Sequence, residues 1–167
     1  MRLNKFRIER AGLSDLGVLH KLEVECFKKN AYSKTSLGLL LTDWRAASFK
    51  AIMNERIVGF IIGRVERIRG KRAGRIYTLN VEPKCRRRGI GEALMKRLEE
   101  EFSKRGCEEI FLEVAVNNVP AITLYKKLGY EVVEKLRNYY GLGKDAYRAK
   151  KIVKSSELES ESIIKGS

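Results

Sequence analysis

Apolar residues recur along the chain with two different spacings. Alternating apolar and polar positions are typical of half-buried strands, and apolar positions three or four residues apart are typical of amphipathic helices. Alternating or short, mostly apolar runs between turn residues predict strands over residues 3–10, 49–53, 56–68, 75–81, 110–116, 130–136 and 146–152. The helical spacing predicts helices that begin near Ser14, Ser33, Gly89 and either Asn117 or Asn118. This order of elements indicates a mixed α/β domain.

Turn and capping residues divide these predicted elements. The side chains of Ser14 and Ser33 can each accept a hydrogen bond from a free N–H group at the start of a helix. Residues 54–55 separate two strands in the manner of a hairpin, and Gly70 and Gly74 bracket a basic turn. The strand over residues 110–116 is mostly apolar, which is typical of a sheet covered on both faces.

The length of 167 residues suits one ordinary domain. Hydrophobic residues make up 44% of the chain, which is enough to form a core. We therefore predict one folded domain over residues 1–153. Residues 154–167 are rich in Ser and Glu and offer little to pack, so we expect a flexible tail there.

The formal net charge of +14 adds a strongly basic surface to this domain. The tail has more glutamates than lysines, so the basicity belongs to the folded part. Such a surface attracts anionic cofactors, acidic substrates or a nucleic-acid-rich partner such as a ribosome. A basic surface that only aids solubility explains the charge equally well.

Cysteine and histidine are too scattered to predict a metal site. The three cysteines, Cys26, Cys85 and Cys107, and the one histidine, His20, lack the close spacing of zinc ligands. The odd cysteine count also argues against a disulfide framework. Charges interrupt the region near the start, and the most apolar run, residues 57–63, is too short to span a bilayer. We expect a cytoplasmic protein without a metal or a membrane partner.

Three consecutive arginines precede the third predicted helix, in the segment Arg86-Arg87-Arg88-Gly89-Ile90-Gly91. A helix N-terminus is already positive, so cations there are unfavourable by about 0.3–1 kcal/mol each. An anionic ligand would relieve this repulsion, and the two glycines would let it approach the backbone. The segment favours a pyrophosphate cradle, although a solvated basic helix start with a glycine turn fits the same residues.

Two common phosphate motifs do not fit this segment. The chain has no Gly-x-x-x-x-Gly-Lys-[Ser/Thr] P-loop, and no third glycine follows Gly91 as the dinucleotide fingerprint requires. The pattern Arg86-x-x-Gly89-x-Gly91 instead resembles the [Gln/Arg]-x-x-Gly-x-[Gly/Ala] signature of the GNAT superfamily of N-acetyltransferases. Residues 79–83 (LNVEP) and 92–95 (EALM), on either side, are also similar to that family.

A narrower resemblance lies further along the chain. Residues 112–130 (LEVAVNNVPAITLYKKLGY), 137–140 (RNYY) and 145–147 (DAY) resemble the RimI-like and archaeal Ard1-like protein N-terminal acetyltransferases. The similarity covers roughly residues 5–150. It implies the GNAT fold, a central, mostly antiparallel seven-stranded sheet with a splayed parallel pair, flanked by about four helices.

The resemblance also implies acetyl-CoA as the co-substrate. The backbone of Leu79, Asn80 and Val81 would bind the pantetheine arm, and one N–H group there would stabilise the oxyanion. Asn118 would contact the cofactor from the next helix, although a plain helix cap also explains this residue. The pyrophosphate would lie against Arg86, Arg87, Arg88, Gly89, Ile90, Gly91 and Glu92.

Glu113 and Tyr125 are the candidate catalytic residues. Glu113 stands in an otherwise apolar strand, where a carboxylate is costly unless it has partners or opens onto a polar cleft. A solvent-facing edge position fits Glu113 as well, and Tyr125 is a core tyrosine by pattern alone. The resemblance makes Glu113 the general base, directly or through water, and Tyr125 the general acid that protonates the CoA thiolate.

The acceptor is also suggested by the resemblance. Tyr139 and Tyr140, before the last strand, would grip the first residues of a peptide, and Tyr32 would form the opposite wall. An aromatic turn that packs on the hairpin also explains the tyrosine pair. A protein α-amine, with a pKa of about 7.7–8.0, loses its proton at neutral pH at a cost roughly 3.5 kcal/mol lower than lysine does. It therefore suits a modest base such as Glu113.

The leading hypothesis is an enzyme that acetylates protein N-termini, ribosomal proteins among them, by direct attack in a ternary complex. The alternatives are acetylation of lysines or small amines, and a non-catalytic basic module that binds RNA or ribosomes. The chain departs from bacterial relatives at Ala31-Tyr32, where they carry Pro-Trp, and at Ala115, where an arginine is usual. These departures leave the preferred first residue of the acceptor open.

Overall fold

The computed structural model describes residues 5–153. The expected tail over residues 154–167 lies outside the described residues, as do residues 3 and 4 of the first predicted strand. The described residues divide into two compact units, residues 5–64 with 77–98 and residues 65–76 with 99–153. In the part that the structure describes, no helix is both long and apolar enough to cross a membrane.

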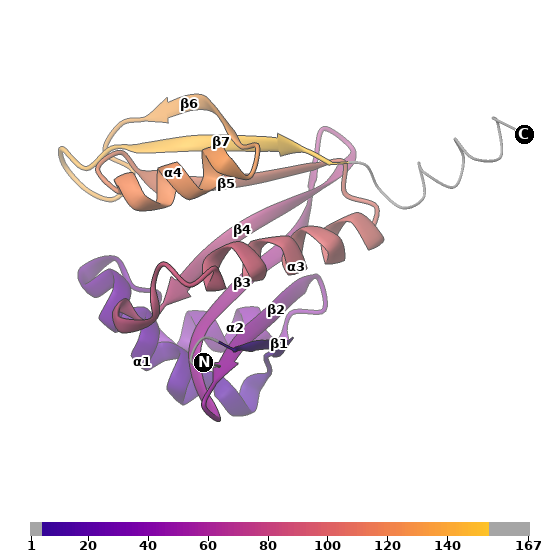
Figure 1. Cartoon of the computed structure of the whole chain (residues 1–167). Coiled ribbons are helices and arrows are strands. Elements are labelled where there is room, and N and C mark those ends of the chain that lie inside the picture. Colours follow the sequence, from indigo (N-terminus) through magenta and orange to yellow (C-terminus); the bar gives the residue numbers. More distant parts are fainter. Residues whose placement is uncertain (1–4, 154–167) are drawn as a thin grey trace, which may run out of the picture. The chain divides into compact units, whose positions relative to one another are not determined.

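Within residues 5–153, seven strands form one sheet in the order β1-β2-β3-β4-β5-β7-β6, and the elements can be followed along the chain in Figure 1. The strands are β1 (Arg7–Arg10), β2 (Ala46–Met53), β3 (Arg56–Ile68), β4 (Lys71–Val81), β5 (Glu109–Ala115), β6 (Glu131–Leu136) and β7 (Ala146–Ile152). The α-helices of this range are α1 (Leu16–Phe27), α2 (Lys34–Thr42), α3 (Ile90–Lys104) and α4 (Val119–Lys127). The β4–β5 pair is parallel and the sheet is otherwise mostly antiparallel, which confirms the predicted fold class.

In the first unit, β2 and β3 form the predicted hairpin around Asn54 and Glu55. Both residues have positive φ, 53° and 59°, which is the left-handed pair that a tight two-residue hairpin turn requires. β2 begins three residues before its predicted start, because its ladder with β3 extends to the pair Ala46↔Arg64.

The core of the first unit joins α1 and α2 to β3. Its fully packed members come from all three elements and are Leu19, Leu22, Leu37, Leu40, Phe60 and Ile62. Ser33 caps α2 as predicted, because its Oγ accepts a hydrogen bond from Ser36 N at 3.1 Å. The two helices are therefore fixed on the sheet by apolar packing and, for α2, by a side-chain cap.

The predicted cap of α1 by Ser14 is wrong. α1 begins at Leu16, and Ser14 lies in a short 3-10 helix, Leu13–Asp15, that precedes it. The side chain that accepts a hydrogen bond here is Asp15, from Gly12 N at 2.9 Å. Lys50 also contacts Asp15 at 3.0 Å, so the chain entry into α1 is held by a charge-assisted contact that a serine could not make.

In the second unit, the parallel ladder between β4 and β5 is shorter than either strand. It runs from Ala73↔Glu109 to Ile76↔Leu112. β4 continues to Val81 and β5 to Ala115. The ladder thus ends before both strands do, as a splayed pair requires.

The turn predicted between Gly70 and Gly74 is shorter than expected, and its predicted end at Gly74 is wrong. The turn residues are Arg69 and Gly70, which have φ of 53° and 78°, and β4 already begins at Lys71. Gly74 lies inside β4 because the ring of Phe102 packs directly on its backbone. A Cβ atom at this position would lie 2.4 Å from Cδ2 of Phe102, so the glycine serves close packing and not a turn.

β5 starts and ends one residue earlier than predicted, and the expectation that both of its faces are covered is wrong. Burial alternates along the strand: Ile110, Leu112 and Val114 are buried, whereas Phe111 and Glu113 are half-buried. The half-buried face, with neighbouring residues of the same unit, lines a cavity of about 600 Å³. One face of β5 belongs to the core, and the other opens onto a polar cavity.

Candidate active site

The loop before α3 has a backbone that suits an anion. Arg87 and Gly89 have positive φ, 63° and 81°, and Arg88 between them does not. Left-handed residues are typical of loops whose backbone N–H groups bind anions. α3 then begins at Ile90, and Gly89 O accepts the first helical hydrogen bond from Ala93 N at 3.0 Å. Both loop arginines are exposed and can reach a ligand bound there.

The side chain of Arg86 turns back toward the end of β4. Its Nε donates to Val81 O at 3.2 Å, and its Nη2 lies 3.8 Å from Sγ of Cys26. The Cys26 thiol also donates to Val81 O at 3.6 Å, and burial raises the pKa of this thiol, which keeps it protonated. Of the backbone groups predicted to hold pantetheine, the Val81 carbonyl therefore already has two protein donors.

A buried carboxylate holds β4 beside the start of α2. Glu23, on α1, is 1% exposed. Its Oε1 accepts hydrogen bonds from Thr78 Oγ1 at 2.6 Å and Asn80 Nδ2 at 3.0 Å, and its Oε2 accepts one from Tyr32 N at 3.1 Å. Asn80 is also 1% exposed, and its Nδ2 is held inside this cluster by Glu23 and Thr78.

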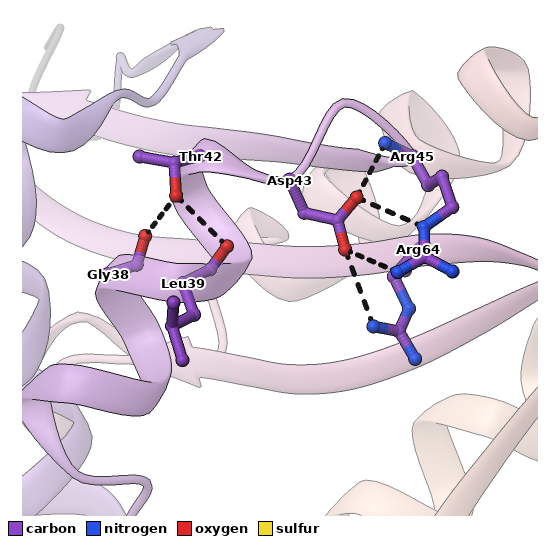
Figure 2. A network of polar contacts seen from close by, with 6 residues as sticks. All are labelled: Gly38, Leu39, Thr42, Asp43, Arg45 and Arg64. Atoms are coloured by element: carbon purple, nitrogen blue, oxygen red, sulfur yellow. Dashed lines mark hydrogen bonds and ion pairs between the residues drawn. The ribbon is translucent and has the colours of Figure 1, made fainter.

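Tyr32 is also braced by a charged cluster that follows α2. The Tyr32 and Tyr77 rings lie 6.5 Å apart, and the Arg64 guanidinium lies 5.2 Å from the Tyr77 ring centre. Figure 2 shows Asp43 accepting hydrogen bonds from Arg45 and Arg64, at 3.0 and 3.4 Å. Those hydrogen bonds, chiefly from the Arg45 side chain, lower the pKa of Asp43 to about 2. The carboxylate is therefore charged at neutral pH and keeps Arg64 over the tyrosine.

In the second unit, two arginines hold the side chain of Glu113, which is 6% exposed. Arg75 Nη2 lies 2.8 Å from Glu113 Oε1, and Arg148 Nη2 lies 3.4 Å from the same oxygen. Arg148 is the residue directly opposite Glu113 in the β5–β7 ladder. The two cations offset the cost of removing this carboxylate from water.

The two tyrosines predicted to hold the acceptor contact Arg75 and the backbone of Glu113. Tyr139 OH accepts a hydrogen bond from Arg75 Nη2 at 3.1 Å, and Tyr140 OH donates to the backbone oxygen of Glu113 at 3.5 Å. The two rings are nearly perpendicular, at 88°, with centres 4.9 Å apart. The β6–β7 loop is therefore anchored to Arg75 and to the strand that carries Glu113. An aromatic turn that only packs on the hairpin would not need these hydrogen bonds.

Asn118 directly precedes α4, and Tyr125 lies within this helix. Asn118 caps this helix, because its Oδ1 accepts from Ala121 N at 3.3 Å. The Tyr125 ring meets the Tyr130 ring edge-on at 6.1 Å, and burial raises the pKa of Tyr125 to about 12. Its phenol is therefore protonated at neutral pH. Within the described residues, no hydrogen bond joins Tyr125 to Glu113.

Sequence reasoning missed three charged residues of these clusters, namely Glu23, Arg75 and Arg148. Glu23 left a signal, since it stands four residues after Leu19 on the apolar face of a helix, where a carboxylate requires buried partners. No sequence pattern pointed to Arg75 or Arg148. Their relation to Glu113 depends on strand register, which alternation within one strand does not give.

Comparisons with known proteins identify the family of the chain. Residues 16–130 match the acetyltransferase (GNAT) family. The N-alpha-acetyltransferase of Sulfurisphaera tokodaii is 36% identical over 86% of this chain and 90% of its own length. That of Saccharolobus solfataricus is 38% identical over 85% and 90%. The crystal structure of Ard1 from Thermoplasma volcanium has a TM-score of 0.81 with 26% identity, covering 89% of this chain and 97% of that one.

The chain therefore belongs to the GNAT family of acetyltransferases. Within that family it is an acetyl-CoA-dependent N-acetyltransferase. The loop before α3 and the polar clusters around Glu23 and Glu113 are the candidate functional features of this enzyme.

Proposed function

We propose that this enzyme transfers the acetyl group of acetyl-CoA to the α-amine at the N-terminus of proteins. The observation that carries the proposal is the similarity to two archaeal proteins named N-alpha-acetyltransferase, each matched over 90% of its length. The tyrosine pair that the family resemblance assigns to the acceptor peptide supports it, because this pair is anchored beside Glu113.

The first unit supplies the proposed cofactor contacts. The backbone of residues 79–81 would bind pantetheine and stabilise the oxyanion, and residues 86–92 would bind the pyrophosphate. The left-handed residues Arg87 and Gly89 favour the second role, since loops that bind anions through backbone N–H groups commonly contain such residues. Asn118, whose Oδ1 caps α4, is a further proposed cofactor contact.

The second unit supplies the proposed proton transfers. The amine attacks the thioester carbon, and Glu113 takes its proton directly or through water. The C–S bond then breaks, and Tyr125 gives its proton to the departing CoA thiolate. A phenol with a pKa of about 12 is fully protonated at neutral pH and so holds the proton to be given, although the raised pKa makes it a weaker acid than an ordinary tyrosine. Tyr32, Tyr139 and Tyr140 would hold the acceptor.

A peptide panel tests this proposal. Each peptide would carry one internal lysine and would be offered with a free or a formylated N-terminus, with acetyl-CoA. We expect mass spectrometry to place the acetyl group on the free α-amine and to find the blocked peptide unmodified. Acetylation of lysine in both peptides would overturn the N-terminal assignment, and absence of CoA release with either would favour a binding module.

Ribosomal proteins are the substrate class that the charge of the chain favours. A net charge of +14 attracts acceptors that are presented near RNA. We expect the enzyme to co-sediment with ribosomes at low salt and to dissociate as salt rises, because counterion release governs such binding. Failure to co-sediment at low salt would remove this part of the proposal and leave the N-terminal activity untouched.

A further inference from the structure

One nitrogen of Arg75 contacts both the proposed base and the proposed acceptor loop. Nη2 of Arg75 lies 2.8 Å from Oε1 of Glu113 and donates to Tyr139 OH at 3.1 Å. All three residues belong to the second unit. A guanidinium Nη carries two hydrogens, so one atom can serve both partners at once.

Strand register explains why Arg75 reaches Glu113. Arg75 pairs with Phe111 in the β4–β5 ladder. Glu113 is two residues further along β5, so its side chain points to the same face of the sheet as that of Phe111. Arg148 approaches from the other neighbouring strand, but it also lies 2.9 Å from Glu134. Arg75 thus makes the shorter contact with Glu113, and Arg148 divides its charge between two carboxylates.

We propose that Arg75 is a positioning residue that couples the β6–β7 loop to Glu113. It fixes the orientation of the carboxylate through Oε1, which leaves Oε2 to accept the proton of the acceptor amine. The same guanidinium holds Tyr139, so the loop is seated when the carboxylate is aligned. This inference rests on the proposed function of Glu113 as a base.

Lysine cannot replace arginine in this role. An ammonium carries the same charge, but it is a compact group on a flexible stem and does not present donors in a fixed plane. Arg75→Lys therefore separates the loss of geometry from the loss of charge. Tyr139→Phe removes only the hydroxyl that accepts from Arg75. Arg69→Lys, in the exposed turn before β4, is the matched control.

The test is a double-mutant cycle on a peptide with a free N-terminus. We expect Arg75→Lys to lower kcat/KM for the peptide about 10- to 100-fold, since a catalytic group displaced by an ångström loses about that much. Tyr139→Phe should raise the KM for the peptide, and the double variant should be no worse than Arg75→Lys alone. The KM for acetyl-CoA and the Arg69→Lys control should match the wild type.

Additive effects in the cycle would overturn the coupling, as would an Arg75→Lys enzyme with wild-type kinetics. If Arg75→Lys fails to fold by circular dichroism, Tyr139→Phe alone decides, and an unchanged peptide KM would reject the proposal. A wild-type enzyme that acetylates only lysines would instead refute the proposed function. The same cycle on a lysine peptide would then still report on Arg75, so the two failures are distinguishable.

Discussion

The carboxylate of Glu23 accepts a 2.6 Å hydrogen bond from the hydroxyl of Thr78, with neither side chain in contact with bulk water. Asn80 Nδ2 and Tyr32 N donate to the same carboxylate. One side chain on α1 thus orders both the strand predicted to bind the cofactor and the loop predicted to face the acceptor. All of its hydrogen-bond partners are donors. A substitution that adds a donor at this position would therefore leave it without an acceptor.

Glu23→Gln should destabilise the fold by about 1–3 kcal/mol, because the new NH2 group would face donors and leave a buried polar group without a partner. The free energy of unfolding in urea measures this. Glu25→Gln is the matched control, since Glu25 is exposed on the same helix. Equal stabilities for the two variants would show that the buried hydrogen bonds contribute nothing specific.

Gly74→Ala should cost about 1–3 kcal/mol, the usual penalty for overpacking. The added Cβ atom would lie 2.4 Å from the Phe102 ring, which cannot withdraw because it is fully buried. Gly17→Ala serves as the control, because nothing lies within 4 Å of a Cβ atom there and alanine favours a helix. We expect thermal melts in which the first variant loses stability and the second gains it.

Glu113→Gln should lower kcat/KM for the acceptor peptide about 10²- to 10⁴-fold, the usual contribution of a general base. Steady-state kinetics across pH measures the loss, and Glu131→Gln, exposed on β6, should behave as the wild type. A variant with the rate and pH profile of the wild type would remove Glu113 from the mechanism.

Tyr125→Phe should reduce kcat about 10²-fold or more if the phenol protonates the leaving thiolate. Circular dichroism should show an intact fold, since the ring and its edge-on contact with Tyr130 are kept. Tyr147→Phe, on β7, is the control for loss of a tyrosine hydroxyl. Turnover at the wild-type rate would exclude the acid role.

The raised pKa of Tyr125 also predicts alkaline instability. Its phenol ionises at an ordinary pKa of 10.0 in the unfolded chain and at about 12 in the folded one. The stabilisation is therefore complete below pH 10 and is lost as pH rises from 10 to 12, by about 1–3 kcal/mol. Urea unfolding across this range should show a steeper loss for the wild type than for Tyr125→Phe. If stability fell equally with pH in both proteins, the raised pKa of Tyr125 would be contradicted.

Local signals predicted much of the fold. The apolar patterns located every strand and α-helix of residues 5–153, and the ends of β3 and β7 agree to the residue. The errors arose where a local signal had a tertiary cause. Gly74 was interpreted as a turn residue, but it is required by the Phe102 ring. Ser14 was interpreted as a cap, but Asp15, held by Lys50 from β2, occupies that place.

By itself, the sequence determined the order of elements, the arginine- and glycine-rich segment before α3 and the family resemblance, because these depend on residues close together in the chain. Tertiary structure alone decided the partners of Glu113. Strand register brings Arg75 and Arg148 from two other strands to this one carboxylate, and the β6–β7 loop brings Tyr139 to Arg75. Side-chain contacts across strands depend on that register, and no local pattern encodes it.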